Sequence, residues 1–132
     1  MRQLSAILAL WAGITACAQA AEPITLGLNY PRTGPYKEEG LAQMRGALLA
    51  IDEINAQGGV LGRPLRLSSK DTASRPAKAE KNVDKLAAEG AVMLFGGSSS
   101  AVAIAAGKRA KEHGLLYFGT LTYSNDPTGQ DG

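Results

Sequence analysis

Cysteine and histidine are almost absent from this 132-residue sequence, which holds only Cys17 and His113. A single thiol cannot close an internal disulfide. A zinc site built from these two residue types takes three or four of them, so the sequence excludes such a centre. We therefore expect no metal site.

Glycine patterns that hold nucleotides are missing as well. The segment GLNYPRTG (residues 27–34) follows the first expected strand but lacks the G-x-G-x-x-G spacing that lets a pyrophosphate approach a helix. Gly107 and Lys108 lie inside an expected helix and not at its start, so they do not form a P-loop. No cofactor is expected.

Charge of either sign is modest and well mixed. Fourteen Lys and Arg residues face twelve Asp and Glu residues, for a formal net charge of +2. Basic and acidic residues alternate between positions 78 and 89, which is typical of a solvated helix face. We expect no nucleic-acid partner.

The first twenty residues differ in composition from the rest. A single positive charge precedes a short apolar run (residues 4–15) and a small-residue exit, the layout of a secretory signal peptide. The run is too short to cross a bilayer as a mature helix. Ala18 and Ala20 fit the small-residue cleavage rule and predict a mature start at Ala21, but residues 14–17 also fit a lipobox that would lipidate Cys17. We expect residues 1–20 to be a signal peptide and residues 21–132 to form one domain.

Strand and helix patterns alternate along residues 21–132. A helix is indicated by the apolar series Leu41, Met44, Ala47, Leu48, Ile51 and Ile54, and ends at Gly58 or Gly59. Pro76 opens a second helix that runs to Ala88 and buries Ala79, Val83, Leu86 and Ala87. The third helix covers residues 99–113, and strands are expected at residues 24–29, 65–69, 91–95 and 115–119. The β-α-β-α-β-α-β order predicts an α/β fold with a parallel, doubly wound sheet and helices on both faces.

Ligands of such sheets bind beyond the carboxyl ends of the strands. Four expected loops lie there: residues 30–39, 71–75, 96–100 and 120–126. The third loop, GGSSS, allows three interpretations. A serine could cap the following helix, Ser98 could be a nucleophile, or the open backbone N–H groups could receive an oxyanion at the helix N-terminus.

A serine hydrolase built on Ser98 is the least favoured of these. The segment at residues 96–100 nearly matches G-x-S-x-G, but its fifth position is Ser100. The one histidine, His113, lies at the far end of the same helix, roughly 20 Å away at 1.5 Å per residue. We expect His113 to end that helix and to interact with its dipole. Of the other two interpretations, the residues favour a ligand site.

The loop at residues 120–126 supports a polar site beside the serines. Thr120, Thr122, Tyr123 and Ser124 supply hydroxyl groups, and adjacent parallel strands would bring the two loops together. The same segment is also an ordinary turn sequence.

Taken together, several segments resemble the amino-terminal lobe of periplasmic binding proteins that serve branched-chain amino acid ABC transporters. They are ITLGLNYPRTGPYKEEG, AIDEINAQGGVLGRPL, DTASRPAKA, GGSSS and FGTLTYS. The resemblance covers essentially all of the segment after residue 20. It implies a type I fold, in which two α/β lobes close around a ligand between them. This chain would supply part of the first lobe, without the carboxyl-terminal lobe, as a fragment of a longer protein.

The resemblance also implies site residues. The serine that grips an amino acid's carboxylate falls on Ser100 with Ser99 beside it, and the N–H groups of Ser100 and Ala101 would assist. The second loop maps onto Thr122 and Tyr123, although the family usually has a threonine where Tyr123 stands. An aromatic that covers the ligand would be Tyr36, and Glu38 and Glu39 lie near it.

The function that follows is capture of a small polar ligand in the periplasm, such as an amino acid, an amide or a urea-like molecule. The ligand would then pass to an ABC permease in the inner membrane, and no enzymatic step is expected. The alternative is a receptor domain that reports its ligand to a signalling partner.

Overall fold

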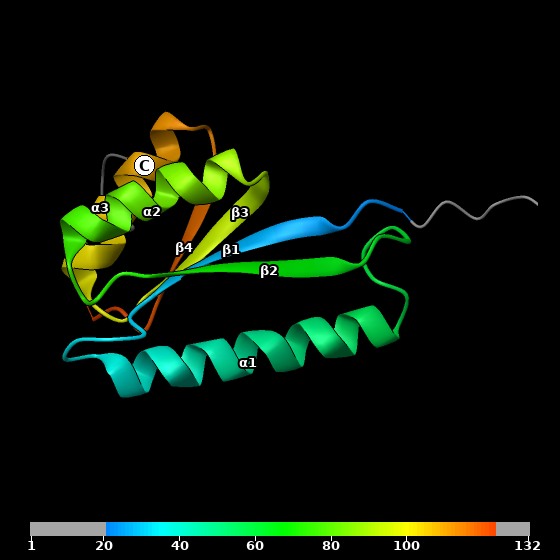
Figure 1. Cartoon of the computed structure of the whole chain (residues 1–132), viewed down its shortest axis with the longest axis horizontal. Helices are drawn as coiled ribbons and strands as arrows, with labels where there is room; N and C mark the ends of the chain where they lie inside the picture. Colours follow the sequence, from blue (N-terminus) through cyan, green and yellow to red (C-terminus); the bar gives the residue numbers. More distant parts are fainter. Residues whose placement is uncertain (1–20, 124–132) are drawn as a thin grey trace, which may run out of the picture.

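The computed structural model describes residues 21–123. The expected signal peptide, Cys17 and Ser124 lie outside the described residues. All seven expected elements are present within a few residues of their expected bounds (Figure 1). They are β1 (Ile24–Tyr30), α1 (Lys37–Ala56), β2 (Leu65–Asp71), α2 (Pro76–Ala88), β3 (Ala91–Gly97), α3 (Ser100–Glu112) and β4 (Leu116–Thr120).

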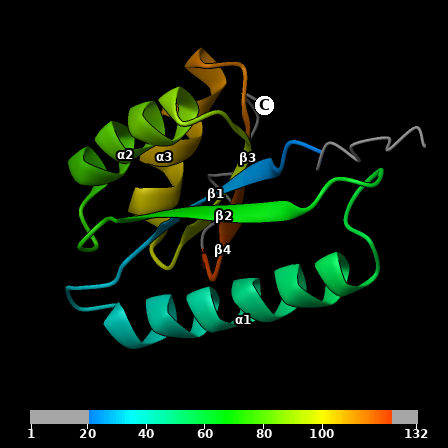
Figure 2. The same ribbon diagram turned by 45° about the vertical axis from the view of Figure 1, so that its right-hand side comes forward.

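The four strands form one parallel sheet in the order β2-β1-β3-β4. The chain steps from β1 to β2 in one direction and returns to β3 on the other side of β1. Helix α1 therefore covers one face of the sheet, and α2 and α3 cover the other (Figures 1 and 2). This arrangement confirms the doubly wound α/β fold, with its switch point between β1 and β3.

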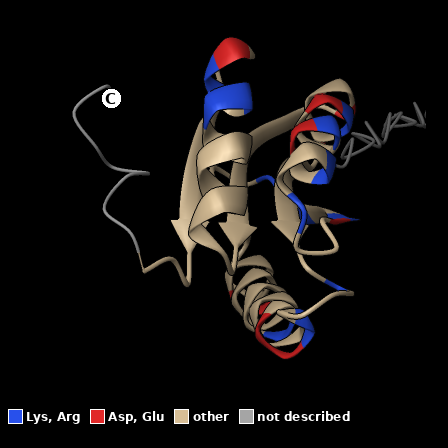
Figure 3. Cartoon of the chain, turned by 90° about the vertical axis from the view of Figure 1, so that its left-hand side faces the viewer, with Lys and Arg blue, Asp and Glu red and all other residues tan. Residues whose placement is uncertain are grey.

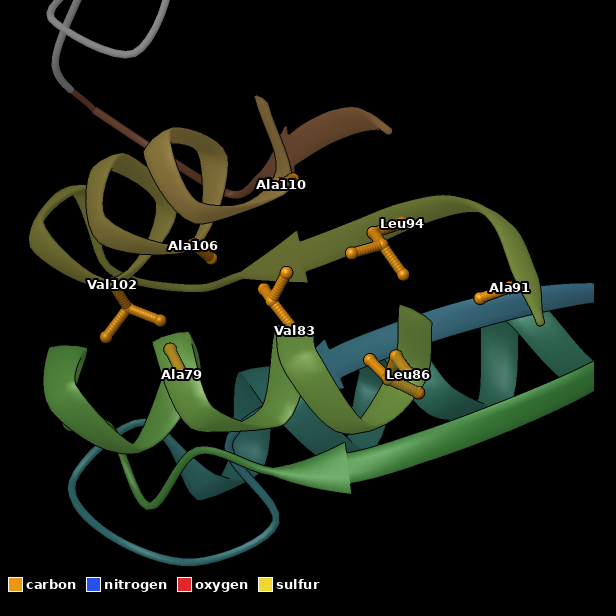
Figure 4. Packing of buried hydrophobic residues seen from close by; sticks show 8 residues of the cluster. All are labelled: Ala79, Val83, Leu86, Ala91, Leu94, Val102, Ala106 and Ala110. Carbon is orange, nitrogen blue, oxygen red and sulfur yellow. The ribbon is translucent and has the colours of Figure 1, made fainter. Parts of the chain in front are cut away.

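The core lies between the sheet and the pair α2 and α3. Figure 4 shows its buried cluster of Ala79, Val83, Leu86, Ala91, Leu94, Val102, Ala106 and Ala110. Small alanines let the two helices approach each other closely, while Leu86 and Leu94 fill the space against the strands. Full burial of a leucine or valine side chain stabilises the fold by about 1.5–3 kcal/mol. Ala87, also expected in the core, is only half-buried.

The face covered by α1 is packed more loosely than its apolar pattern predicts. Leu48 and Ile54 belong to the apolar series that predicts this helix, yet they are 45% and 36% exposed, and only Gly40 and Ile51 of the helix are buried. Among the described residues, α1 is the one helix on this face, and it packs against β1, β2 and β3. The outer part of its apolar stripe therefore extends beyond the strands that would cover it.

Helix ends follow the expected signals. Gly58 and Gly59 follow α1 with φ of +98° and +76°, and the Gly59 N–H donates to Ile54 C=O at 2.9 Å. Pro76 begins α2 directly after its N-cap Arg75. These positions confirm the helix end predicted from the two glycines and the helix start predicted from the proline.

Some expected bounds and burials were wrong. Gly96 and Gly97, assigned to a loop, are the last residues of β3, and α1 begins at Lys37 inside the first expected loop. Val92 of β3 is 57% exposed, although the sheet was expected to have helices on both faces. The register with β1 shifts there, so that Ala91 pairs with Thr25 and Met93 pairs with Leu26. Val92 is left without a partner on β1.

Candidate functional site

The loops after β3 and β4 meet at the carboxyl edge of the sheet. The Ser98 N–H donates to Thr120 C=O at 3.1 Å, and the Tyr123 N–H donates to Ser100 Oγ at 3.3 Å. The expected proximity of the serine loop and the threonine loop is therefore confirmed. It follows from the pairing of two adjacent parallel strands.

The two glycines before the serines allow a close approach of backbones. Gly96 has φ of +130°, and a Cβ placed on it would lie 2.2 Å from the Asn29 carbonyl oxygen of β1. No other residue type fits there, because such a contact with backbone cannot relax. Gly96 thus lets β3 end tightly against β1 and directs the chain into the serine loop.

Ser98 is buried and held by α1. Only 3% of it is exposed, its φ is +66°, and its hydroxyl accepts a hydrogen bond from Gln43 Nε2 at 2.5 Å. His113 is the C-cap residue of α3, at the other end of the helix, where its Nε2 lies 2.7 Å from Asp84 Oδ1. Ser98 is therefore not paired with His113, the histidine that would have to act as its base in a serine hydrolase. Sequence reasoning missed Gln43, whose spacing on α1 gives no sign of this contact.

Ser99 occupies the N-cap position of α3 without capping it through its side chain. Its backbone is extended, with φ −150° and ψ 133°, and its hydroxyl makes no cap hydrogen bond. The interpretation of a capping serine is therefore wrong for this residue. The Ala103 N–H donates to Ser99 C=O, while the N–H groups of Ala101 and Val102 have no acceptor within the helix.

The start of α3 carries no charged side chain. Figure 3 shows Lys, Arg, Asp and Glu on α1, on α2 and on the last turns of α3, whereas the first turns of α3 and the end of β4 are tan. Residues 98–102 and 119–123 contain no ionisable residue except Tyr123. An anionic group at this position would therefore be attracted mainly by the positive end of the helix dipole and by hydroxyl groups.

The segment after β4 turns sharply. Leu121 has φ of +55°, Thr122 is half-buried and Tyr123 is 95% exposed. A Cβ on Gly119 would lie 3.4 Å from Thr122 Cγ2, so Thr122 folds back over the end of β4. The Thr120 hydroxyl is buried and has no hydrogen-bond partner among the described residues.

Tyr36 lies on a different loop from the other five site residues. It is the N-cap residue of α1, 41% exposed, and its N–H donates to Ser74 Oγ at 3.3 Å. No hydrogen bond in the described chain links Tyr36 to the loops after β3 and β4. Glu38 and Glu39 are exposed in the first turn of α1, where carboxylates stabilise the helix dipole.

Asp71, at the end of β2, is the most heavily bonded side chain at this edge, and sequence reasoning missed it. Its oxygens accept hydrogen bonds from the backbone of Arg32, Thr33 and Ala73, from the Thr33 hydroxyl and from Lys78 Nζ. Burial is the largest single influence on its pKa and raises it. Lys78 and the N–H and O–H donors together outweigh burial and hold the pKa of Asp71 well below its ordinary value.

Two surface hollows lie away from the site residues. A hollow of about 370 Å³ is lined by Asp84, Ala87, Ala88, Ala91, His113 and Leu115, at the edge where α2 and α3 end. There the hydrogen bond from Arg109, and then that from His113, lower the pKa of Asp84. A second hollow of about 270 Å³ is lined by Arg75, Ala77, Lys78 and Lys81. None of the six expected site residues lines either hollow.

Within residues 21–123, no cluster of three or more His, Cys, Asp or Glu side chains is arranged to hold a metal ion. No helix there combines the length and apolarity needed to cross a bilayer.

Comparisons with known proteins agree on one family. Residues 23–132 match the family described as periplasmic binding protein. The Leu/Ile/Val-binding protein BraC3 of Rhizobium johnstonii is 35% identical over 107 residues, which cover 81% of this chain and 29% of that protein. A leucine-, isoleucine-, valine-, threonine- and alanine-binding protein of Pseudomonas aeruginosa is 36% identical over 85 residues, or 64% of this chain and 23% of that protein.

Solved structures give the same picture. The branched-chain amino acid transporter substrate binding protein LivJ of Streptococcus pneumoniae, in complex with isoleucine, superposes with a TM-score of 0.78 at 29% identity. The match covers 81% of this chain and 31% of that one. An ABC transporter substrate-binding protein of Desulfitobacterium hafniense in complex with Leu gives a TM-score of 0.68 at 28% identity, with the same coverage. The chain thus spans less than a third of the length of these relatives.

Proposed function

The chain belongs to the periplasmic binding protein family, and from that premise we propose that it forms the first-lobe part of a solute-binding protein for an ABC transporter. The ligand is a small polar molecule, with a branched-chain amino acid as the first candidate. Relatives whose names give leucine, isoleucine or valine support this choice over an amide or urea.

The meeting of the β3 and β4 loops is the observation that carries the proposal. The ligand's carboxylate would lie at the start of α3, where the N–H groups of Ser100 and Ala101 and the hydroxyls of Ser99 and Ser100 can donate hydrogen bonds. Thr122 would add a hydroxyl from the neighbouring loop, and the exposed ring of Tyr123 would border the ligand. Tyr36 would cover the ligand from the loop after β1.

Binding of this kind involves no covalent step. A helix dipole and hydroxyl groups hold a carboxylate reversibly, and release needs no bond to be broken. The relatives are more than three times as long as the matched segment, so a second lobe would contact the rest of the ligand and close over it. The closed form would then deliver the ligand to a permease in the inner membrane.

Family membership implies a place outside the cytoplasm. We propose that residues 1–20 are the signal peptide that directs export, and that residues 21–132 belong to the mature lobe. Cleavage after Ala20 would leave the protein free in the periplasm, whereas lipidation of Cys17 would anchor it. Mass spectrometry of the mature amino terminus distinguishes the two outcomes.

Calorimetry on the complete polypeptide that carries this sequence tests the function. We expect L-leucine, L-isoleucine or L-valine to bind, and leucinol, which lacks the carboxylate, to fail. Ser100→Ala should weaken binding by about 10- to 100-fold, since a hydrogen bond to a charged group contributes about 1.5–3 kcal/mol. Ser68→Ala, a serine on β2 that bonds Glu89, is the matched control and should bind as the parent does.

Two results would overturn the proposal. If no amino acid, no amide and no urea binds, the proposed solute-binding function is contradicted. Equal binding of leucine and leucinol would show that the start of α3 does not bind the ligand's carboxylate.

A further inference from the structure

The loops that follow β1 and β2 interlock around one carboxylate. Asp71 Oδ1 accepts the N–H groups of Arg32 at 2.9 Å, Thr33 at 3.1 Å and Ala73 at 2.9 Å. Asp71 Oδ2 accepts the Thr33 hydroxyl at 2.8 Å and Lys78 Nζ at 2.9 Å. The first loop is therefore fixed to the end of β2, about forty residues further along the chain.

The two loops also approach each other too closely for a side chain. Gly34 has φ of +91°, and a Cβ on it would lie 2.8 Å from the Ala73 carbonyl oxygen and 3.0 Å from Ser74 Oγ. Ala73 and Ser74 both have positive φ, 48° and 57°, an unusual conformation for two successive residues other than glycine. This strained turn places Ser74 Oγ where it accepts the Tyr36 N–H.

Tyr36 lies at the end of the segment that these contacts hold, and its C=O accepts the Gly40 N–H of α1 at 3.0 Å. It begins α1 as the N-cap residue, but its side chain makes no capping hydrogen bond that would fix the entry of the chain into the helix. Residues 32–36 are all exposed. The bonds to Asp71 and Ser74 are the side-chain contacts that hold this segment.

We propose that Asp71 is a positioning residue for ligand binding, which acts by holding the loop that presents Tyr36. The inference rests on the proposed function, because Tyr36 matters only if a ligand binds at this edge. Asp71 itself would touch no ligand. Its side chain is only 11% exposed, and all of its described hydrogen bonds go to protein groups.

Affinity and hydrogen exchange of the complete polypeptide test the proposal. Asp71→Ala should raise the Kd for leucine by about tenfold, as expected when a contact worth about 1.4 kcal/mol is lost. Hydrogen exchange should become faster in a peptide that covers residues 31–36. Asp71→Asn replaces Oδ2, the acceptor of Lys78 Nζ and of the Thr33 hydroxyl, with an amide NH2 group that cannot accept from them. It keeps one oxygen for the three backbone donors of the loops, so it should keep most of the parent affinity.

A double-mutant cycle with Tyr36→Ala shows whether Asp71 acts through the loop. In the Tyr36→Ala background, Asp71→Ala should have little further effect on Kd, because the group that it positions is already gone. Fully additive effects would overturn the proposal. A purely structural role would lower the free energy of unfolding without this coupling.

Asp84→Ala is the matched control. Asp84 is likewise bonded to basic side chains, those of Arg109 and His113, but at the far edge of the molecule. Its loss should leave Kd unchanged. Should Asp71→Ala fail to fold, Ser74→Ala, which removes only the acceptor of the Tyr36 N–H, should still weaken binding and speed exchange in residues 31–36.

The outcomes separate the two proposals. A parent protein that binds leucine, with an Asp71→Ala variant that binds it equally well, overturns the positioning role and leaves the function intact. A parent that binds none of the ligands overturns the function, and the positioning role with it.

Discussion

Ser98, Ser99 and Ser100 follow one another in the chain, and each hydroxyl lies in a different environment. Ser98 is buried and accepts a hydrogen bond from Gln43, whereas Ser100 accepts one from the backbone of Tyr123. Ser99 begins α3 and is half-buried. At the scale of single residues, burial and nearby donors decide what a serine does, so residue type alone leaves several roles open.

Asp71 should give the protein a distinct dependence of stability on pH. Its pKa in the folded state lies below the ordinary value near 3.9 of an unfolded aspartate. The folded state is therefore stabilised above about pH 4, and this contribution is lost as pH falls further towards the lowered pKa. Urea unfolding of the parent and of Asp71→Asn between pH 2.5 and 7 should give free-energy curves that converge at the acid end.

Other carboxyl groups contribute to both curves, so the difference between parent and variant isolates Asp71. Glu80→Gln removes an exposed carboxyl on α2 with no described ion pair, and its curve should stay parallel to that of the parent. A constant difference between parent and Asp71→Asn across this pH range would contradict the prediction.

At the scale of elements, the three helices differ in how completely they are packed. Helices α2 and α3 share a core with β3, in which Val83, Leu86 and Leu94 have no exposed surface. Helix α1 is longer but leaves Leu48 and Leu49 45% and 63% exposed. Stability therefore depends much more on side chains of α2 than on apolar residues of similar size on the outer part of α1.

A matched pair of substitutions measures this difference. Leu86→Ala should lower the free energy of unfolding by about 2–5 kcal/mol, because it removes buried surface and leaves a cavity. Leu49→Ala should change it by less than about 0.5 kcal/mol, as exposed substitutions usually do. Chemical denaturation monitored by circular dichroism gives both values. Equal losses would mean that the outer face of α1 is buried in solution.

At the scale of the whole molecule, the candidate site, the Asp84 contacts and the exposed apolar side chains of β4 lie on different parts of the surface. The carboxyl edge of the sheet carries the candidate site, while the ion pair of Asp84 with Arg109 and the contact of Asp84 with His113 lie at the opposite edge. Tyr117 of β4 packs against the α2 and α3 core, so its neighbours Leu116 and Phe118 point to the α1 face. There they are 67% and 53% exposed.

The exposed Leu116 and Phe118 should affect how the 132-residue chain behaves in solution by itself. We expect it to bind the dye ANS and to self-associate, because exposed apolar patches favour both. Leu116→Thr combined with Phe118→Ser should reduce dye fluorescence and the apparent mass in sedimentation without changing the far-ultraviolet spectrum. Val60→Thr, at an exposed valine between α1 and β2, is the control and should have little effect. A parent chain that binds no dye would contradict the prediction.

The sequence by itself determined the seven elements, their order and the parallel sheet. It did so because apolar spacing, glycine and proline act over a few residues, and because parallel strands joined by helices allow few topologies. The meeting of Ser100 with Tyr123 also followed, since it needs only two neighbouring strands to end together.

Only the tertiary structure decided the contacts between distant loops and the extent of burial on each face. Gln43 reaches Ser98 across 55 residues, and Asp71 holds Thr33 across 38. Such contacts depend on the turn of a helix and on the path of a loop, which no local pattern encodes. The exposure of Leu48 likewise depends on where α1 lies against the strands, and that position is set by the packing of the whole sheet.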